Sequence, residues 1–227
     1  MPATPSAHTP PLPSRAAAGA FSSTVVVMAV GNALLTTALL RQVTGPPRDA
    51  LIGSVAVLLV ALAVATVASV ALVRSRPTLS GGALWCGALS GALLTGHLVL
   101  EVVGNHVGEG AAITLVSMAG AVGIWAWAGT HGRSAFEGAG AGLGAAVLAV
   151  QVVVCGGLVL VMTGHPSAPY VAQWPEFRRS GWTDAAAFAV ANGLDSATSH
   201  VLFACVVGPV AGSVAAVSAS SRTSRRK

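Results

Sequence analysis

The chain has 227 residues, of which 54% are hydrophobic, 8% are charged and 5% are aromatic. Because a soluble domain carries roughly 25% charged residues, this composition excludes a soluble protein built around one core. It also excludes a disordered chain and a disulfide scaffold, since apolar residues are abundant and the three cysteines lie inside apolar runs, without a CxxC pattern or a zinc-type spacing to histidine. We therefore expect a multi-pass integral membrane protein whose helices contact the lipid bilayer.

The net charge of +5 could suggest a nucleic-acid partner, but the basic residues are unevenly placed. Four of the twelve occupy the last six positions, as Arg222, Arg225, Arg226 and Lys227. A basic cluster beside a membrane span marks the cytoplasmic side and contacts anionic lipid. No predicted element presents a basic face interleaved with aromatic residues, so we expect no nucleic-acid binding.

The first residues differ from everything that follows. Residues 1–15 contain five prolines and no apolar periodicity, so we expect residues 1–18 to form a disordered, proline-rich tail. They do not resemble a signal peptide, because Arg15 is the only basic residue before the first apolar run and the small residues precede that run instead of following it.

Apolar runs long enough to span a membrane begin after this tail. A transmembrane helix needs about 20 residues to cross about 30 Å of hydrocarbon. Six runs meet that requirement, at 19–40, 50–73, 82–103, 111–129, 138–163 and within 184–217. The alternating pattern of a β-barrel is absent, and only helices and closed barrels satisfy their backbone in lipid. The sequence thus predicts an all-α bundle of six transmembrane helices over residues 19–217, followed by a basic cytoplasmic tail at 218–227.

The last run is longer than one straight span requires. Its 34 residues would form a helix about 50 Å long. Either residues 184–191 lie at the membrane interface before the span begins, or the helix tilts and bends at Gly208 and Pro209, where proline removes a backbone hydrogen bond.

Lysine and arginine residues predict the orientation. With six spans, the N-terminal tail, the second and fourth loops and the C-terminal tail share one side and carry eight basic residues, against four on the other side. The positive-inside rule then places both termini in the cytoplasm of a cell membrane. Two belts of interfacial aromatic residues agree with this arrangement. The inner belt comprises Trp85, Trp125 and Trp127, and the outer belt Tyr170, Trp174 and Trp182.

Two spans carry ionisable side chains, which are costly in hydrocarbon and therefore mark candidate functional sites. In the third span His97 and Glu101 are four residues apart and so lie about 40° apart on one helix face. In the sixth span a polar arc of about 140° runs from Asn192 to His200. Because both groups lie in the outer half of the membrane, we expect them to meet. The predicted substrate- or ion-binding set is His97, Glu101, Gln151, Asn192, Asp195, Ser199 and His200.

Several kinds of chemistry fit this set. His97, Glu101, Asp195 and His200 are donors that a transition metal accepts, and the same groups could relay protons. Alternatively, the polar residues only join helices by hydrogen bonds. No catalytic residue, resident metal or cofactor is predicted, because the chain has no GxSxG or HExxH motif. An enzymatic role is therefore not expected.

Two further features bear on assembly. Glycine pairs four residues apart, such as Gly138 with Gly142 and Gly208 with Gly212, predict close helix packing within a compact bundle or a dimer. The long outer connection at 164–183 either covers the polar site or lies on the lipid headgroups, and its arginines and aromatic rings favour the headgroups.

The favoured functional hypothesis is a small permease, or a proton- or cation-coupled membrane protein, that acts on a small solute or a proton. The alternative is a non-catalytic scaffold or accessory subunit that binds a membrane-protein partner or a second copy of itself. A second alternative is intramembrane metal binding.

Overall fold

The structure is a computed structural model that describes residues 15–43, 46–104 and 110–224. Six long helices are each long and apolar enough to cross a membrane. They are α1 (Arg15–Gln42), α2 (Pro46–Ser75), α3 (Ser80–Gly104), α4 (Gly110–Gly129), α5 (Ala135–Met162) and α8 (Ala185–Ser224). Three short helices are η1 (Pro77–Leu79), α6 (Ala168–Val171) and α7 (Pro175–Ser180), and these ranges contain no strand. The predicted all-α membrane bundle is confirmed.

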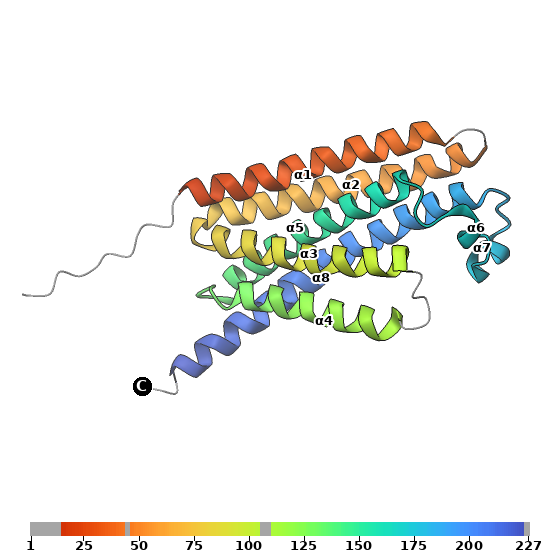
Figure 1. Ribbon diagram of the computed structural model, residues 1–227. Helices are drawn as coiled ribbons and strands as arrows, with labels where there is room; N and C mark the ends of the chain where they lie inside the picture. Colours follow the sequence, from red (N-terminus) through yellow and green to blue (C-terminus); the bar gives the residue numbers. More distant parts are fainter. Residues whose placement is uncertain (1–14, 44–45, 105–109, 225–227) are drawn as a thin grey trace, which may run out of the picture.

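The helices lie side by side in one bundle, with distinct features at its two ends (Figure 1). α1 begins and α8 ends at one end, which we call the termini end. The connection that contains α6 and α7 lies at the opposite end, which we call the loop end. An even number of spans places the two termini of the bundle on the same side.

The two ends of the bundle extend beyond the predicted limits. α1 begins at Arg15, inside the predicted tail 1–18, and α8 continues to Ser224, inside the predicted tail 218–227. The remainders of both predicted tails, 1–14 and 225–227, lie outside the described residues. Apolar residues alone set the predicted limits, whereas a helix continues through polar residues once it leaves the hydrocarbon.

α8 is continuous, so its length does not come from a separate interfacial segment. It has 40 residues and is therefore about 60 Å long, with Pro209 inside the helix. Asp184 caps its beginning, because Oδ1 accepts hydrogen bonds from the backbone N–H groups of Ala186 and Ala187 at 2.9 and 3.1 Å. Figure 1 shows α8 crossing the bundle obliquely, which agrees with the predicted tilt.

α5 is the central helix and packs against α1, α2, α3, α4 and α8. Glycines make these approaches possible. A Cβ atom on Gly142 would collide with the backbone carbonyl of Gly208, and one on Gly138 would collide with that of Gly212. At the contact between α3 and α5, a Cβ on Gly87 of α3 would lie 2.8 Å from Leu148 Cβ. The predicted small-residue contacts therefore join helices within a single chain.

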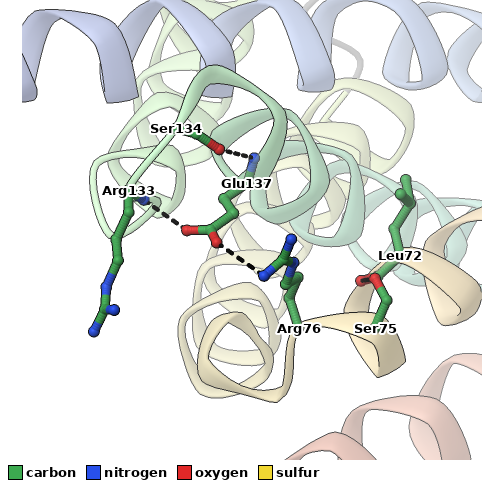
Figure 2. Close-up of polar contacts among 6 residues, drawn as sticks. All are labelled: Leu72, Ser75, Arg76, Arg133, Ser134 and Glu137. Carbon is green, nitrogen blue, oxygen red and sulfur yellow. Dashed lines mark hydrogen bonds and ion pairs between the residues drawn. The ribbon is translucent and has the colours of Figure 1, made fainter.

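A capping arrangement fixes the start of α5 at the termini end (Figure 2). Ser134 is the N-cap, and its Oγ accepts a hydrogen bond from the backbone N–H of Glu137 at 3.2 Å. Glu137 in turn accepts from the backbone N–H of Arg133 at 2.8 Å, and its second carboxylate oxygen lies 3.5 Å from a guanidinium nitrogen of Arg76. The cluster connects the turn after α2 to the beginning of α5.

Two of the three members of the predicted inner aromatic belt are exposed on the surface of the bundle. Trp85 and Trp127 are 76% and 58% exposed, as residues at a lipid interface would be. The assignment of Trp125 to this belt is wrong. Trp125 is 1% exposed, and its Nε1 donates a hydrogen bond to Ser90 Oγ at 3.0 Å. Two residues along a helix correspond to a rotation of about 200°, so Trp125 and Trp127 point to opposite faces.

Candidate functional site

A cavity of about 290 Å³ lies at the loop end, between α3, α4, α5 and α8. Most of its wall is apolar and includes Leu94, Met118, Val154, Leu158 and Val190. Polar side chains enter from α3, α4, α8 and the connection after α5. They are His97, Glu101, Thr114, His165, Asn192, Ser196 and His200.

The α3 wall is organised around His97. Its Nε2 lies 3.0 Å from Thr114 Oγ1 on α4 and 3.5 Å from Glu101 Oε2, one turn further along α3. The side chain of His97 is 11% exposed and that of Glu101 is 44% exposed. Both contacts are compatible with a neutral imidazole that carries its hydrogen on Nε2, because a carboxylate and a hydroxyl oxygen can each accept a hydrogen bond. Nδ1 is then the basic nitrogen, and it is buried with no hydrogen-bond partner among the described residues.

The polar part of the α8 wall consists of three residues spaced by four. Asn192, Ser196 and His200 all line the cavity, and each step of four rotates the side chain by only about 40°. His200 Nδ1 lies 2.6 Å from the backbone carbonyl of Ser196. A carbonyl only accepts, so Nδ1 of His200 carries the hydrogen and Nε2 is the basic nitrogen.

Two predicted residues of α8 do not line the cavity. Asp195 and Ser199 each precede a lining residue, which places them about 100° further around the helix. Ser199 Oγ donates to the backbone carbonyl of Asp195 at 3.0 Å. The predicted arc was therefore too wide, and the stripe that faces the cavity is the one that contains Ser196.

Gln151 also lies outside the cavity. Its side chain is fully buried, and Nε2 donates to Thr66 Oγ1 on α2 at 2.9 Å. Its backbone carbonyl accepts a hydrogen bond from Asn32 Nδ2 on α1 at 3.0 Å. The remaining side-chain amide oxygens, Oε1 of Gln151 and Oδ1 of Asn32, have no hydrogen-bond partner among the described residues. Gln151 thus joins α1, α2 and α5 instead of contributing to the predicted set.

The connection between α5 and α8 packs on the bundle. Val171 is fully buried, and the ring of Phe177 lies 5.5 Å from that of Phe188 on α8. His165, Pro166 and Trp174 from the same connection line the cavity. These contacts agree with the alternative that the connection covers the polar site, while Arg178 and Arg179, on which the headgroup expectation depended, are exposed.

Three polar lining residues are absent from the predicted set. Ser196 lay within the predicted polar arc of the sixth span, whereas Thr114 and His165 were missed altogether. Thr114 is one of two hydroxyl residues in an otherwise apolar span, the other being Ser117, and His165 follows α5 in a connection. Neither belongs to a polar stripe, so only the tertiary arrangement reveals them. His97 and Glu101 were identified because they are two ionisable groups on one helix face. Thr114 and His165 have no such neighbour on the same helix face.

The described residues do not provide the set of ligands that the metal-binding hypothesis requires. Over residues 15–43, 46–104 and 110–224, no three His, Cys, Asp or Glu side chains lie close enough together to hold a metal ion. Of the four suggested ligands, Asp195 is outside the lining, while His97 and Glu101 form a pair. Structural and catalytic zinc sites need at least three protein ligands.

Comparisons of the chain with protein-family models, with curated proteins and with solved structures find no match. The geometry of the cavity is therefore the basis on which a function can be proposed.

Proposed function

We propose that this multi-pass membrane protein is a small permease, or a proton- or cation-coupled protein, whose polar site is the cavity at the loop end. The observation that carries this proposal is that polar side chains of α3 and α8, two helices far apart in the sequence, line the same cavity of about 290 Å³. An ionisable residue within a membrane span costs on the order of 2.5 kcal/mol or more at the helix centre, so its retention favours a functional role.

The pair formed by His97 and Glu101 suits a proton-binding role. An imidazole changes its charge between about pH 5 and pH 8. A proton taken up on Nδ1 of His97 would produce an imidazolium whose Nε2–H faces Glu101 at 3.5 Å. The charge of the cavity would change with each proton bound or released, which would couple solute binding to pH.

The orientation is part of this proposal. The excess of basic residues in the N-terminal tail, the second and fourth loops and the C-terminal tail of the sequence, eight against four, supports a cytoplasmic location for both termini in a cell membrane. In that orientation the cavity lies in the half of the protein that faces away from the cytoplasm.

Flux through reconstituted protein tests the proposal. The full chain is placed in liposomes loaded with the pH dye pyranine, and a proton gradient is imposed with benzyltrimethylammonium or benzenesulfonate outside. We expect wild type to change the internal pH faster than protein-free liposomes with at least one of these probes, and Glu101→Gln to remove that difference. Asp195→Asn is the matched control, because it makes the same carboxylate-to-amide change outside the lining. Equal rates in wild type, Glu101→Gln and protein-free liposomes would contradict the proposal.

The second candidate is a scaffold or accessory subunit without transport. The contacts of Gln151 with Thr66 and Asn32 favour it, because they show buried polar groups of this chain joining helices away from the cavity. If His97 and Glu101 act only in this way, Glu101→Gln lowers the thermal stability of the bundle and leaves proton flux at the protein-free level in every variant.

A further inference from the structure

We infer that the cavity at the loop end binds a small organic cation with an apolar body. This inference rests on the proposed function, since it names the ligand of the same site. The first support is the sign of the charge in the lining. Among the described lining residues Glu101 is the only Asp, Glu, Lys or Arg, so the lining carries one negative charge while its imidazoles are neutral.

The second support is the size and character of the walls. A volume of about 290 Å³ is just below the range of about 300 to 1,000 Å³ typical of ligand cavities. It is much larger than a proton or a bare metal ion requires. Leucine, valine and methionine side chains from α3, α4, α5 and α8 make up most of the surface. Such walls favour a ligand that buries apolar surface in addition to its charge.

The third support is the set of groups available to a cationic head. The carboxylate of Glu101 is 44% exposed and can form a charge-assisted hydrogen bond or an ion pair. Trp174 adds an aromatic ring to the lining, and indole rings attract cations. Asn192 and Ser196 offer oxygen acceptors on the α8 wall. An anion would instead meet Glu101 in a largely apolar environment that strengthens repulsion.

Protonation of the lining imidazoles should oppose this preference. The titratable groups that face the cavity are His97 and Glu101 on α3, His165 after α5, and His200 on α8, while the described lining residues of α4 and α5 contribute none. Protonation of the three imidazoles would place three positive charges beside one carboxylate. A cavity with charged imidazoles would therefore bind a permanent cation less tightly than one with neutral imidazoles.

The test compares three probes that share a benzyl or phenyl ring and differ in charge. Affinities of the purified full chain for benzyltrimethylammonium, benzyl alcohol and benzenesulfonate are measured at pH 7.5 by titration calorimetry in lipid nanodiscs. We expect the cation to bind about tenfold more tightly than the other two, the ratio that one charge-assisted contact provides. Glu101→Gln should abolish this ratio. Asp195→Asn should leave it at the wild-type value, because Asp195 is not in the lining.

Folding is controlled with a second variant. Glu101→Asp keeps the negative charge and is expected to retain selectivity for the cation, and each variant is checked for wild-type helicity and elution. Equal binding of all three probes, or tighter binding of benzenesulfonate, would overturn the inference. Selective cation binding without any flux in liposomes would overturn the proposed transport function and leave the ligand class intact, so the two failures are distinguishable.

Discussion

Asn32 on α1 is joined to Gln151 on α5 by a hydrogen bond whose acceptor is the backbone carbonyl of Gln151, at 3.0 Å. Both side chains are fully buried. Since the acceptor belongs to the backbone, this bond does not require the side chain of Gln151. That side chain makes a separate hydrogen bond to Thr66 on α2, at 2.9 Å. One position of α5 therefore holds two neighbouring helices through two independent contacts.

This independence can be measured with double-mutant cycles. Gln151→Leu and Thr66→Val remove the same hydrogen bond, so their effects on the free energy of unfolding should be non-additive by about 0.6 kcal/mol, an average value for hydrogen bonds between membrane helices. Asn32→Leu and Thr66→Val remove different bonds and should be additive within about 0.5 kcal/mol. Unfolding in mixed detergent micelles gives both values. A zero coupling between Gln151 and Thr66 would show that this bond contributes nothing to the packing.

The glycine contact between α5 and α8 predicts a strong dependence on side-chain size. Gly142→Ala places a Cβ against the carbonyl of Gly208, which cannot move without shifting α8. Overpacking of this kind costs about 1–3 kcal/mol. Gly123→Ala on α4 is the control, because a Cβ there has nothing within 4 Å. Thermal unfolding should separate the two variants, and equal stabilities would contradict the close approach of α5 and α8.

The cap of α5 and its neighbouring ion pair should respond differently to salt. Ser134→Ala removes the N-cap acceptor and is expected to cost about 1 kcal/mol of stability. Arg76→Gln removes a cation that is 54% exposed, so its effect should be about 0–1 kcal/mol and should diminish at high ionic strength. Unfolding measured at two salt concentrations distinguishes them. A Ser134→Ala effect that disappears in salt would contradict the assignment of a hydrogen-bonded cap.

Reporter fusions test the orientation. Green fluorescent protein fused after Lys227 should fluoresce, and alkaline phosphatase at the same position should be inactive, because we expect the termini end to face the cytoplasm. Fusions after Gln173, between α6 and α7, should give the opposite pattern. The reverse result at both sites would place the cavity on the cytoplasmic side.

The number and positions of the spans were predictable because hydrocarbon thickness sets a minimum length of apolar sequence. The side of each helix that meets a neighbour was not, because it depends on the rotation of that helix in the bundle. Trp125 and Trp127 illustrate this, since both occur at the end of one span and only Trp127 is exposed. α1 and α8 also extend beyond their predicted residue limits, because helices continue into polar sequence.

The candidate site was predicted only in part, because the rotation of each helix in the bundle also decides which side chains reach the cavity. The pairing of His97 with Glu101 follows from a spacing of four residues within one helix, and the structure has these two side chains 3.5 Å apart. On α8 the polar arc contains two adjacent stripes, and nothing local distinguishes the stripe of Ser196 from that of Asp195. Gln151 was expected in the site because of its depth, but its partners lie on α1 and α2, away from the cavity.

The central claim is that α8 turns the stripe of Ser196 toward a cavity shared with α3. Cysteine accessibility tests it most directly, in a full-length chain whose native Cys86, Cys155 and Cys205 are replaced by alanine. Ser196→Cys and Ser199→Cys are each exposed to a membrane-impermeant, positively charged methanethiosulfonate reagent, with and without benzyltrimethylammonium. We predict that Ser196→Cys reacts rapidly and is protected by the cation, while Ser199→Cys reacts slowly and is not protected. Equal reaction at both positions, or protection of Ser199→Cys alone, would contradict the account.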